Sequence, residues 1–333
     1  MDNLTHSLVG WTMARAGIDR GAAGAAVLVV VGANLPDLDV ITAFGGWLTY
    51  FQYHRGWSHS LAMAPLLALL PLPLWWWFAR KQRPDWKAWA GAWLACFAGI
   101  LSHLFLDCWN SYGIRLAIPF SYEWFQLDWV FVVDLWIWFL LLPAALGPVL
   151  ARLVYSEIGA RKGSGRGGAA LTLALLVAFL AARAGLHSMA LGAMESRLYE
   201  GHAPIHVAAL PGPFVPWRWT GVVETEHTWL LIPVDLGQDF DPESGRRLHR
   251  PEIELPAANA VRNSPTGRVF LAATRFPCWR VLPSRNADGG TSIRITDLRF
   301  GSPEEARYGA SFELDASGRV VKEKFGPISD LER

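Results

Sequence analysis

His103 and Asp107 stand four residues apart at the end of a long apolar run. In a helix this spacing places an imidazole and a carboxylate on one face, where both can bind the same metal ion. A lone histidine in an apolar helix is more often a core residue than a ligand. With an acidic partner one turn away, the two interpretations become comparable, and other motifs must decide between them.

Two such motifs lie elsewhere in the first third of the chain. The run NLPDLD at 34–39 offers two carboxylates after a helix-breaking proline, and HRGWSHS at 54–60 offers two imidazoles as the next apolar run begins. An N-terminal helical hairpin would bring His6 to the same membrane level. Such nitrogen and oxygen ligands suit Zn²⁺ or another divalent transition metal, and one or two ions are expected. The predicted ligands are His6, Asp37, Asp39, His54, His59, His103 and Asp107.

The roles of three residues in these motifs stay open at this point. Asp37 follows a proline, so it can cap the next helical segment, but capping leaves Asp39 unexplained. We favour Asp39 as the ligand and Asp37 as the catalytic base, although either can be the ligand. Arg55 is either an interfacial cation or the group that binds a substrate phosphate, and we include it with Asp37 among the catalytic candidates.

Composition indicates a membrane protein. The 333 residues are 52% hydrophobic and 18% charged, and the mean hydropathy is +0.22. The net charge of +1 and the lack of a long basic block exclude the phosphate-neutralising surface that nucleic-acid binding needs. Only three cysteines are present, in no zinc or redox spacing, which disfavours thiolate metal sites and disulfides.

Four apolar runs are long enough to predict spanning helices, at 60–79, 88–106, 129–151 and 167–194. Residues 4–16 and 21–33 predict the hairpin that precedes them. Lysine and arginine gather at one set of helix ends, where they are Arg15, Arg20, Arg80, Lys81, Arg83, Lys87, Arg152, Arg161, Lys162 and Arg166, against Arg55 and Arg115 at the other. The positive-inside rule then predicts a multi-pass inner-membrane protein with an extracytoplasmic C-terminal domain.

The character of the sequence changes near residue 205. Runs such as WRWTGVVETEHTWLLIPVDL, GRVFLAATRFPCWRVL and TSIRITDLRF are short and rich in β-branched and aromatic residues between turn signals. We therefore expect a mainly α membrane protein followed by a small β-rich soluble domain. The predicted domains are a transmembrane helical metal-binding domain at 1–195 and the β-rich domain at 205–333.

The motifs MDNLTHSLVGW, NLPDLD, HRGWSHS and SHLFLDCWNSYG resemble the membrane-bound metal-dependent hydrolase family, the YdjM-type inner-membrane proteins. The chain is more distantly similar to zinc-dependent phospholipase C, whose clustered metals imply comparable positions at His6, Asp37 or Asp39, His54 or His59, and His103 with Asp107. Those enzymes carry a further histidine soon after the last motif, whereas Asn110 to Gly113 follow here. The resemblance therefore implies one or two ions rather than three.

The favoured function is hydrolysis of a phosphoester or other ester in a lipid or amphiphilic substrate by a metal-activated water. The partners expected on this interpretation are the lipid bilayer and such a substrate. The alternative is a metal-binding membrane protein without hydrolytic activity, acting as a sensor, a transporter or a structural protein. Transport would need polar residues continuing through the bilayer, and the run 88–101 offers none.

Overall fold

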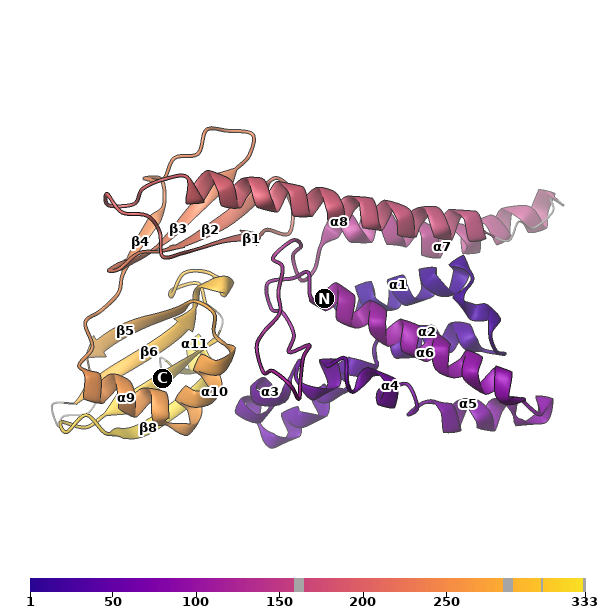
Figure 1. Cartoon of the computed structure of the whole chain (residues 1–333), viewed down its shortest axis with the longest axis horizontal. Helices are drawn as coiled ribbons and strands as arrows, with labels where there is room; N and C mark the ends of the chain where they lie inside the picture. Colours follow the sequence, from indigo (N-terminus) through magenta and orange to yellow (C-terminus); the bar gives the residue numbers. More distant parts are fainter. Residues whose placement is uncertain (159–164, 284–289, 307, 332–333) are drawn as a thin grey trace. The chain divides into compact units, whose positions relative to one another are not determined.

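The computed structural model describes residues 1–158, 165–283, 290–306 and 308–331 (Figure 1). Contacts divide the chain into two compact units, which we describe separately. The first unit comprises Met1–Asp39, Arg55–His187 and Pro211–Pro216, and the second comprises Val40–His54, Ser188–Leu210 and Trp217–Arg333. Two of the cationic residues used for the orientation, Arg161 and Lys162, lie outside the described residues.

The N-terminal hairpin is confirmed. Helices α1 (Asn3–Ala16) and α2 (Ala25–Gly32) pack together and are joined through the short helix η1 (Ile18–Arg20). The Asp2 carboxylate caps α1 by accepting from the Thr5 amide. Gly17 ends α1 with a φ of 126°, a conformation that side chains disfavour.

Helix α6 (Trp86–Asp107) packs tightly against α2. A Cβ on Gly32 would lie 2.1 Å from the Cys96 carbonyl oxygen, and one on Gly99 would lie 2.2 Å from the Val29 carbonyl oxygen. The two backbones can approach this closely because both positions lack a side chain. This approach sets the end of α2 beside the end of α6, where His103 lies.

The apolar run 60–79 was predicted to be one helix, and this prediction is wrong. It contains Pro65, Pro71 and Pro73, which interrupt helical hydrogen bonding. The run instead forms two short helices joined by turns, α4 (Ala64–Leu67) and α5 (Leu72–Ala79), and it is flanked by η3 (Trp57–His59) and η4 (Arg80–Gln82). The helical segments Trp47–His59 and Ala64–Gln82 are bent relative to each other by 88°.

Two helices among the described residues are long and apolar enough to cross a membrane, namely α6 and α8 (Arg166–Glu195). Two bent helix pairs raise the number to as many as four if each pair is one span. One is the broken region just described, and the other joins α2 to η2 (Leu35–Gly45) with a 45° bend. The run predicted at 129–151 begins its helix later, as α7 (Leu135–Ile158).

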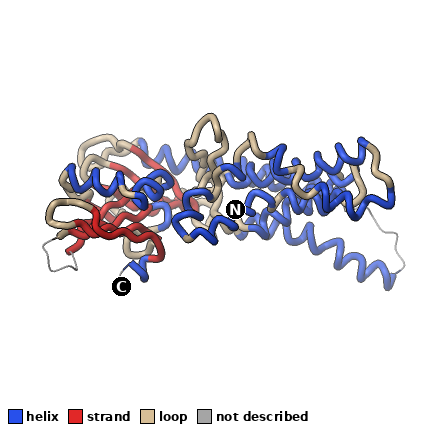
Figure 2. The backbone as a smooth tube through the Cα atoms, turned by 90° about the horizontal axis from the view of Figure 1, so that it is seen from below, coloured by secondary structure: helices blue, strands red, loops and turns tan. Residues whose placement is uncertain are grey.

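The second unit is rich in β-structure, as predicted (red in Figure 2). Its first sheet has the strand order β1-β2-β3-β4, and its second has the order β5-β6-β7-β8. The strands of the first sheet are β1 (His206–Pro211), β2 (Arg218–Glu224), β3 (Thr228–Asp235) and β4 (Arg246–His249). Those of the second are β5 (Pro277–Pro283), β6 (Thr291–Asp297), β7 (Tyr308–Leu314) and β8 (Val320–Pro327).

Helices α9 (Leu255–Asn263) and α10 (Pro265–Ala273) precede the second sheet, and the short elements η5 (Leu298–Phe300) and α11 (Ile328–Leu331) follow β6 and β8. The run beginning at Gly267 was predicted as extended, but its first part is α10. Ser264 caps that helix by accepting from the Gly267 amide, with Pro265 at its first position. These two local signals outweigh the β-branched composition.

Helix α3 (Trp47–Tyr53) belongs to the second unit by its contacts, although it lies early in the sequence. The Phe51 ring lies 4.8 Å from Phe325 and 5.8 Å from Phe270, between their centroids. These rings join the core formed by β6, β7 and the two preceding helices. A continuous domain boundary between 195 and 205 thus stays a prediction.

Candidate metal centre

Four of the predicted ligands converge in the first unit. Asp37, His59, His103 and Asp107 each offer one donor atom, and these atoms all lie within 4.8 Å of one another. They come from η2, η3 and the last turns of α6. The side chains of His59, His103 and Asp107 are fully buried, and that of Asp37 is 16% exposed.

The backbone fixes the tautomer of His103. Its Nδ1 lies 2.8 Å from the carbonyl oxygen of Ala33, the residue that follows α2. A carbonyl only accepts, so Nδ1 carries the proton and donates it. The lone pair of Nε2 is therefore directed into the cluster, as metal-binding histidines require.

Hydrogen bonds between side chains fix the tautomer of His59. Its Nδ1 lies 2.9 Å from the Ser58 hydroxyl, which in turn donates to Asp39 Oδ2 at 3.0 Å. Asp39 Oδ2 also accepts from the Arg55 amide at 2.9 Å and lies 3.4 Å from His59 Nδ1. Asp39 therefore orients His59 from behind, and the Nε2 lone pair of His59 is directed to the cluster.

Five distances among the donor atoms are close to those between the ligands of one divalent metal ion. His59 Nε2 lies 3.1 Å from His103 Nε2, 3.4 Å from Asp37 Oδ1 and 3.5 Å from Asp107 Oδ2. His103 Nε2 lies 3.7 Å from Asp37 Oδ1 and 3.4 Å from Asp107 Oδ2. Zinc bonds of about 2.0–2.2 Å place tetrahedral ligands about 3.3–3.6 Å apart. Buried Asp107 Oδ2 accepts no hydrogen bond from the described residues.

The other oxygen of Asp107 is held by the protein. Oδ1 accepts from Arg55 Nη2 and from Asn110 Nδ2, each at 3.3 Å, and contacts the α-amino group of Met1. Arg55 is buried and also donates to Asn110 Oδ1 and the Gly113 carbonyl oxygen, both at 3.2 Å. Asn110 was not among the predicted site residues. Asn110 lies in the turn that follows α6, three residues after Asp107, and that short spacing is the signal that could have identified it.

The remaining predicted ligands lie outside the group of four. His6 is buried and stacks on His103 with ring centroids 3.8 Å apart, and its Nε2 lies 3.4 Å from Asp107 Oδ1. Neither ring nitrogen of His6 is hydrogen-bonded to a described residue. His54 belongs to the second unit, where it ends α3 and stacks on Tyr50 at 4.5 Å. Metal ligation by these two residues stays a prediction.

The C-terminal part of the chain matches a known domain family. The family model described as YfhP C-terminal alpha/beta plait domain matches residues 256–333, which covers α9, α10 and the second sheet. The chain is 26% identical over 143 residues to the Uncharacterized protein YfhP of Bacillus subtilis (strain 168). That match spans 40% of this chain and 42% of the relative, so it covers less than half of either protein.

No solved structure matches the chain. A second family model, described as YdjM inner membrane protein, matches residues 1–189. This match contains all four residues of the buried cluster and more than half of the chain. The chain is therefore a multi-pass protein of the inner membrane and belongs to the YdjM inner membrane protein family.

Proposed function

We propose that the cluster of Asp37, His59, His103 and Asp107 binds a divalent metal, with Zn²⁺ favoured, and hydrolyses an ester in a lipid or amphiphilic substrate. The observation that carries the proposal is the 3.1 Å separation of the two Nε2 atoms. Both rings use Nδ1 as a donor, so two lone pairs face each other. A cation between them removes the repulsion that this arrangement would otherwise produce.

A divalent metal held there supplies Lewis acidity to a phosphoryl or carbonyl oxygen and lowers the pKa of a water molecule. The side chain of Asp37 is 16% exposed, whereas the other three are fully buried. Solvent and substrate therefore reach the cluster beside Asp37. We assign to the second carboxylate oxygen of Asp37 the role of general base for the attacking water.

Arg55 supports this chemistry by its charge. Its guanidinium lies 3.3 Å from Asp107 and is held by neutral oxygens of Asn110 and Gly113. The positive charge of Arg55 beside the cluster can balance negative charge that develops on a substrate phosphate. We prefer a phosphoester over a carboxylic ester for this reason.

Exposed apolar side chains beside the ligands favour an amphiphilic substrate. Leu38 stands between the two aspartates and is 57% exposed, and Trp57, two residues before His59, is 45% exposed. Exposed apolar groups next to a buried polar cluster suit a molecule with an apolar tail and a polar ester.

A structural metal is the second candidate, because three of the four donor side chains are fully buried. A structural site uses all four side chains as its ligands and leaves no position for substrate, whereas hydrolysis needs a further, open position on the ion. It would join η2, η3 and α6 without any hydrolysis.

The test uses the full-length protein in detergent, stripped with a chelator and reloaded with Zn²⁺ or Mn²⁺. Release of phosphate or headgroup from a panel of phospholipids is measured before and after reloading. Asp37→Asn should slow turnover by about 10²- to 10⁴-fold, while Asp19→Asn in the hairpin turn should not change it. Metal that restores thermal stability without hydrolysis of any substrate would support the structural role instead.

A further inference from the structure

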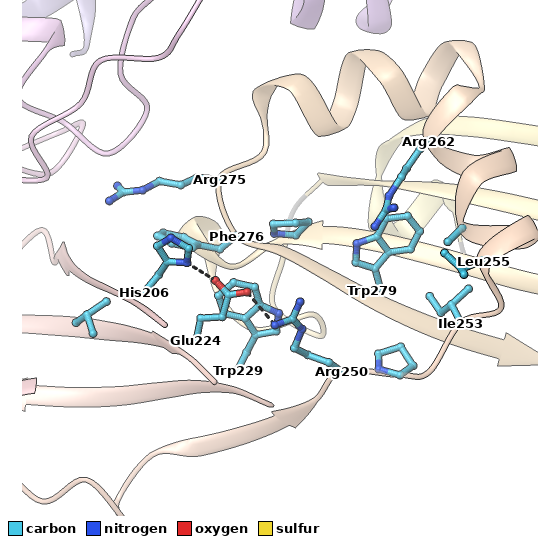
Figure 3. Close-up of a pocket in the computed structure, with 14 residues that line it drawn as sticks. His206, Glu224, Trp229, Arg250, Ile253, Leu255, Arg262, Arg275, Phe276 and Trp279 are labelled. Atoms are coloured by element: carbon cyan, nitrogen blue, oxygen red, sulfur yellow. Dashed lines mark hydrogen bonds and ion pairs between the residues drawn. The ribbon is translucent and has the colours of Figure 1, made fainter. Parts of the chain in front are cut away.

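The second unit contains a pocket of about 570 Å³ whose lining includes no residue of the metal centre (Figure 3). One wall comes from β1, β2, β3 and the segment after β4, and the other comes from α9 and the start of β5. Trp229 and Phe276 lie on opposite sheets, with ring centroids 5.9 Å apart, and belong to one buried core. The two walls are therefore packed against each other.

The pocket has an excess of positive charge in a chain whose net charge is only +1. Arg250, Arg262 and Arg275 line it together with a single acidic residue, Glu224. The Glu224 carboxylate already binds His206 Nδ1 at 2.7 Å and Arg250 Nη1 at 2.8 Å. Arg262 forms no ion pair with any carboxylate in the described part of the chain.

Each of the three arginines lies over an aromatic ring. The guanidinium carbon is 5.5 Å from the Trp229 ring for Arg250, 5.8 Å from Trp279 for Arg262, and 4.7 Å from Phe276 for Arg275. Stacking restrains the plane of a guanidinium while its N–H groups remain able to donate. Such preorganised donors favour binding of a phosphate or another oxyanion.

The aromatic and aliphatic lining adds a second requirement. Figure 3 shows Arg262 extending from α9 toward Trp279, whereas Arg250 extends toward Glu224 and Trp229. Ile253 and Leu255 line the same end of the pocket. A bare phosphate would leave these apolar surfaces exposed to water, so a ligand with an apolar body gains more from the pocket.

We propose that this pocket binds an organic phosphate, with the phosphate at Arg262 and an aromatic or other apolar body against Trp279, Ile253 and Leu255. The ligand is either a soluble aromatic phosphate or the headgroup region of an anionic phospholipid, which share this chemistry. The proposal does not depend on the proposed hydrolase, because all the lining residues belong to the second unit.

The experiment uses the full-length protein in detergent after removal of metal, so that the metal centre does not contribute. Isothermal titration calorimetry with 1-naphthyl phosphate represents the soluble source, and dihexanoyl phosphatidic acid represents the lipid source. Tighter binding of one probe identifies the source, and binding of either supports the pocket. Inorganic phosphate and 1-naphthol, each carrying half of the proposed chemistry, should bind more weakly than the intact aromatic phosphate.

Two variants test the location. Arg262→Gln removes one charged donor on an exposed helix position and should weaken binding by about 10- to 100-fold. Arg268→Gln, on α10 and outside the pocket, should leave the affinity within about twofold. Equal affinities of wild type and Arg262→Gln, or no binding of either probe at about 1 mM, would overturn the proposal.

Discussion

His59 and His103 face each other through their Nε2 atoms at 3.1 Å while each ring donates its Nδ1 proton elsewhere. The Ala33 carbonyl fixes one ring, and the Ser58 and Asp39 side chains fix the other. A carbonyl at the end of one helix and a carboxylate in a neighbouring turn thus set which nitrogen of each histidine is available.

Removing one imidazole should empty the metal centre. We expect His103→Ala, purified in detergent, to lose its divalent metal in elemental analysis, because one of the four convergent donors is gone. The matched control is Leu104→Ala, which truncates the adjacent buried residue and costs about 2–5 kcal/mol of stability without removing a donor. Full metal content in His103→Ala, or equal loss in both variants, contradicts the assignment.

Helix spacing should matter as much as the ligands. A Cβ at position 99 would lie 2.2 Å from the Val29 carbonyl oxygen, so Gly99→Ala must force α6 away from α2. We expect a destabilisation of about 1–3 kcal/mol and weaker metal binding, because Ala33 moves away from His103. Thermal unfolding in detergent and metal titration measure the two effects.

The control for this variant is Gly185→Ala in α8, where nothing lies within 4 Å of the added Cβ. Alanine replaces glycine in a helix interior with a gain of up to about 1 kcal/mol, so this change should be neutral or stabilising. A lower melting temperature for Gly99→Ala together with an unchanged or higher one for Gly185→Ala would support the close approach of α2 and α6. A lower melting temperature in both would not.

Local sequence patterns identified four residues that the fold brings together, but they could not specify how each side chain is directed. The i, i+4 spacing of His103 and Asp107 survives because both lie in one helix. The roles of Asp37 and Asp39 depend on how the 3₁₀ turn of η2 directs each side chain, which no periodicity specifies. Sequence analysis favoured Asp39 as the ligand, whereas Asp37 lies within the group of four donors and Asp39 lies behind His59.

The errors in the fold have similar causes. Hydropathy alone predicted a helix at 60–79, but three prolines remove backbone donors that a continuous helix needs. In the second unit, Val269, Phe270 and Leu271 were assigned to an extended run, yet Ser264 and Pro265 begin a helix before them. The division of the strands into two sheets depends on long-range pairing, which short apolar runs cannot specify.

Burial should make Cys278 unreactive. Desolvation raises the pKa of this thiol to about 11, and the thiolate is the nucleophile, so its population at neutral pH is about 10²-fold below that of an ordinary cysteine. We expect iodoacetamide to label the folded protein at Cys278 very slowly and to react at the normal rate in sodium dodecyl sulfate. Peptide mass spectrometry assigns the label, and rapid labelling of the folded protein at this position would contradict the burial of Cys278.

We propose that the second unit faces the extracytoplasmic side, because cationic residues gather at the turns of the hairpin and between α5 and α6. Alkaline phosphatase fused at the C-terminus should therefore be active. The same enzyme fused after Arg83 should be inactive, and a fluorescent protein that folds only in the cytoplasm should show the reverse pattern. Activity of the fusion after Arg83 alone would invert the topology.

The two aspartates of the NLPDLD turn should separate by phenotype. Asp37 Oδ1 lies 3.4 Å from His59 Nε2, within the donor group, whereas Asp39 contacts the Nδ1 side of that ring and the Ser58 hydroxyl. Asp37→Asn should therefore lower the number of metal ions bound at saturation. Asp39→Asn should keep that number and weaken affinity by about 10- to 100-fold, as loss of a group that orients a ligand does. Ser58→Ala should resemble Asp39→Asn, because it breaks the same hydrogen-bonded chain.

Metal titration followed by elemental analysis measures both quantities. Identical loss of bound metal in the two asparagine variants would make both carboxylates ligands, and no change in either would remove this turn from the metal centre.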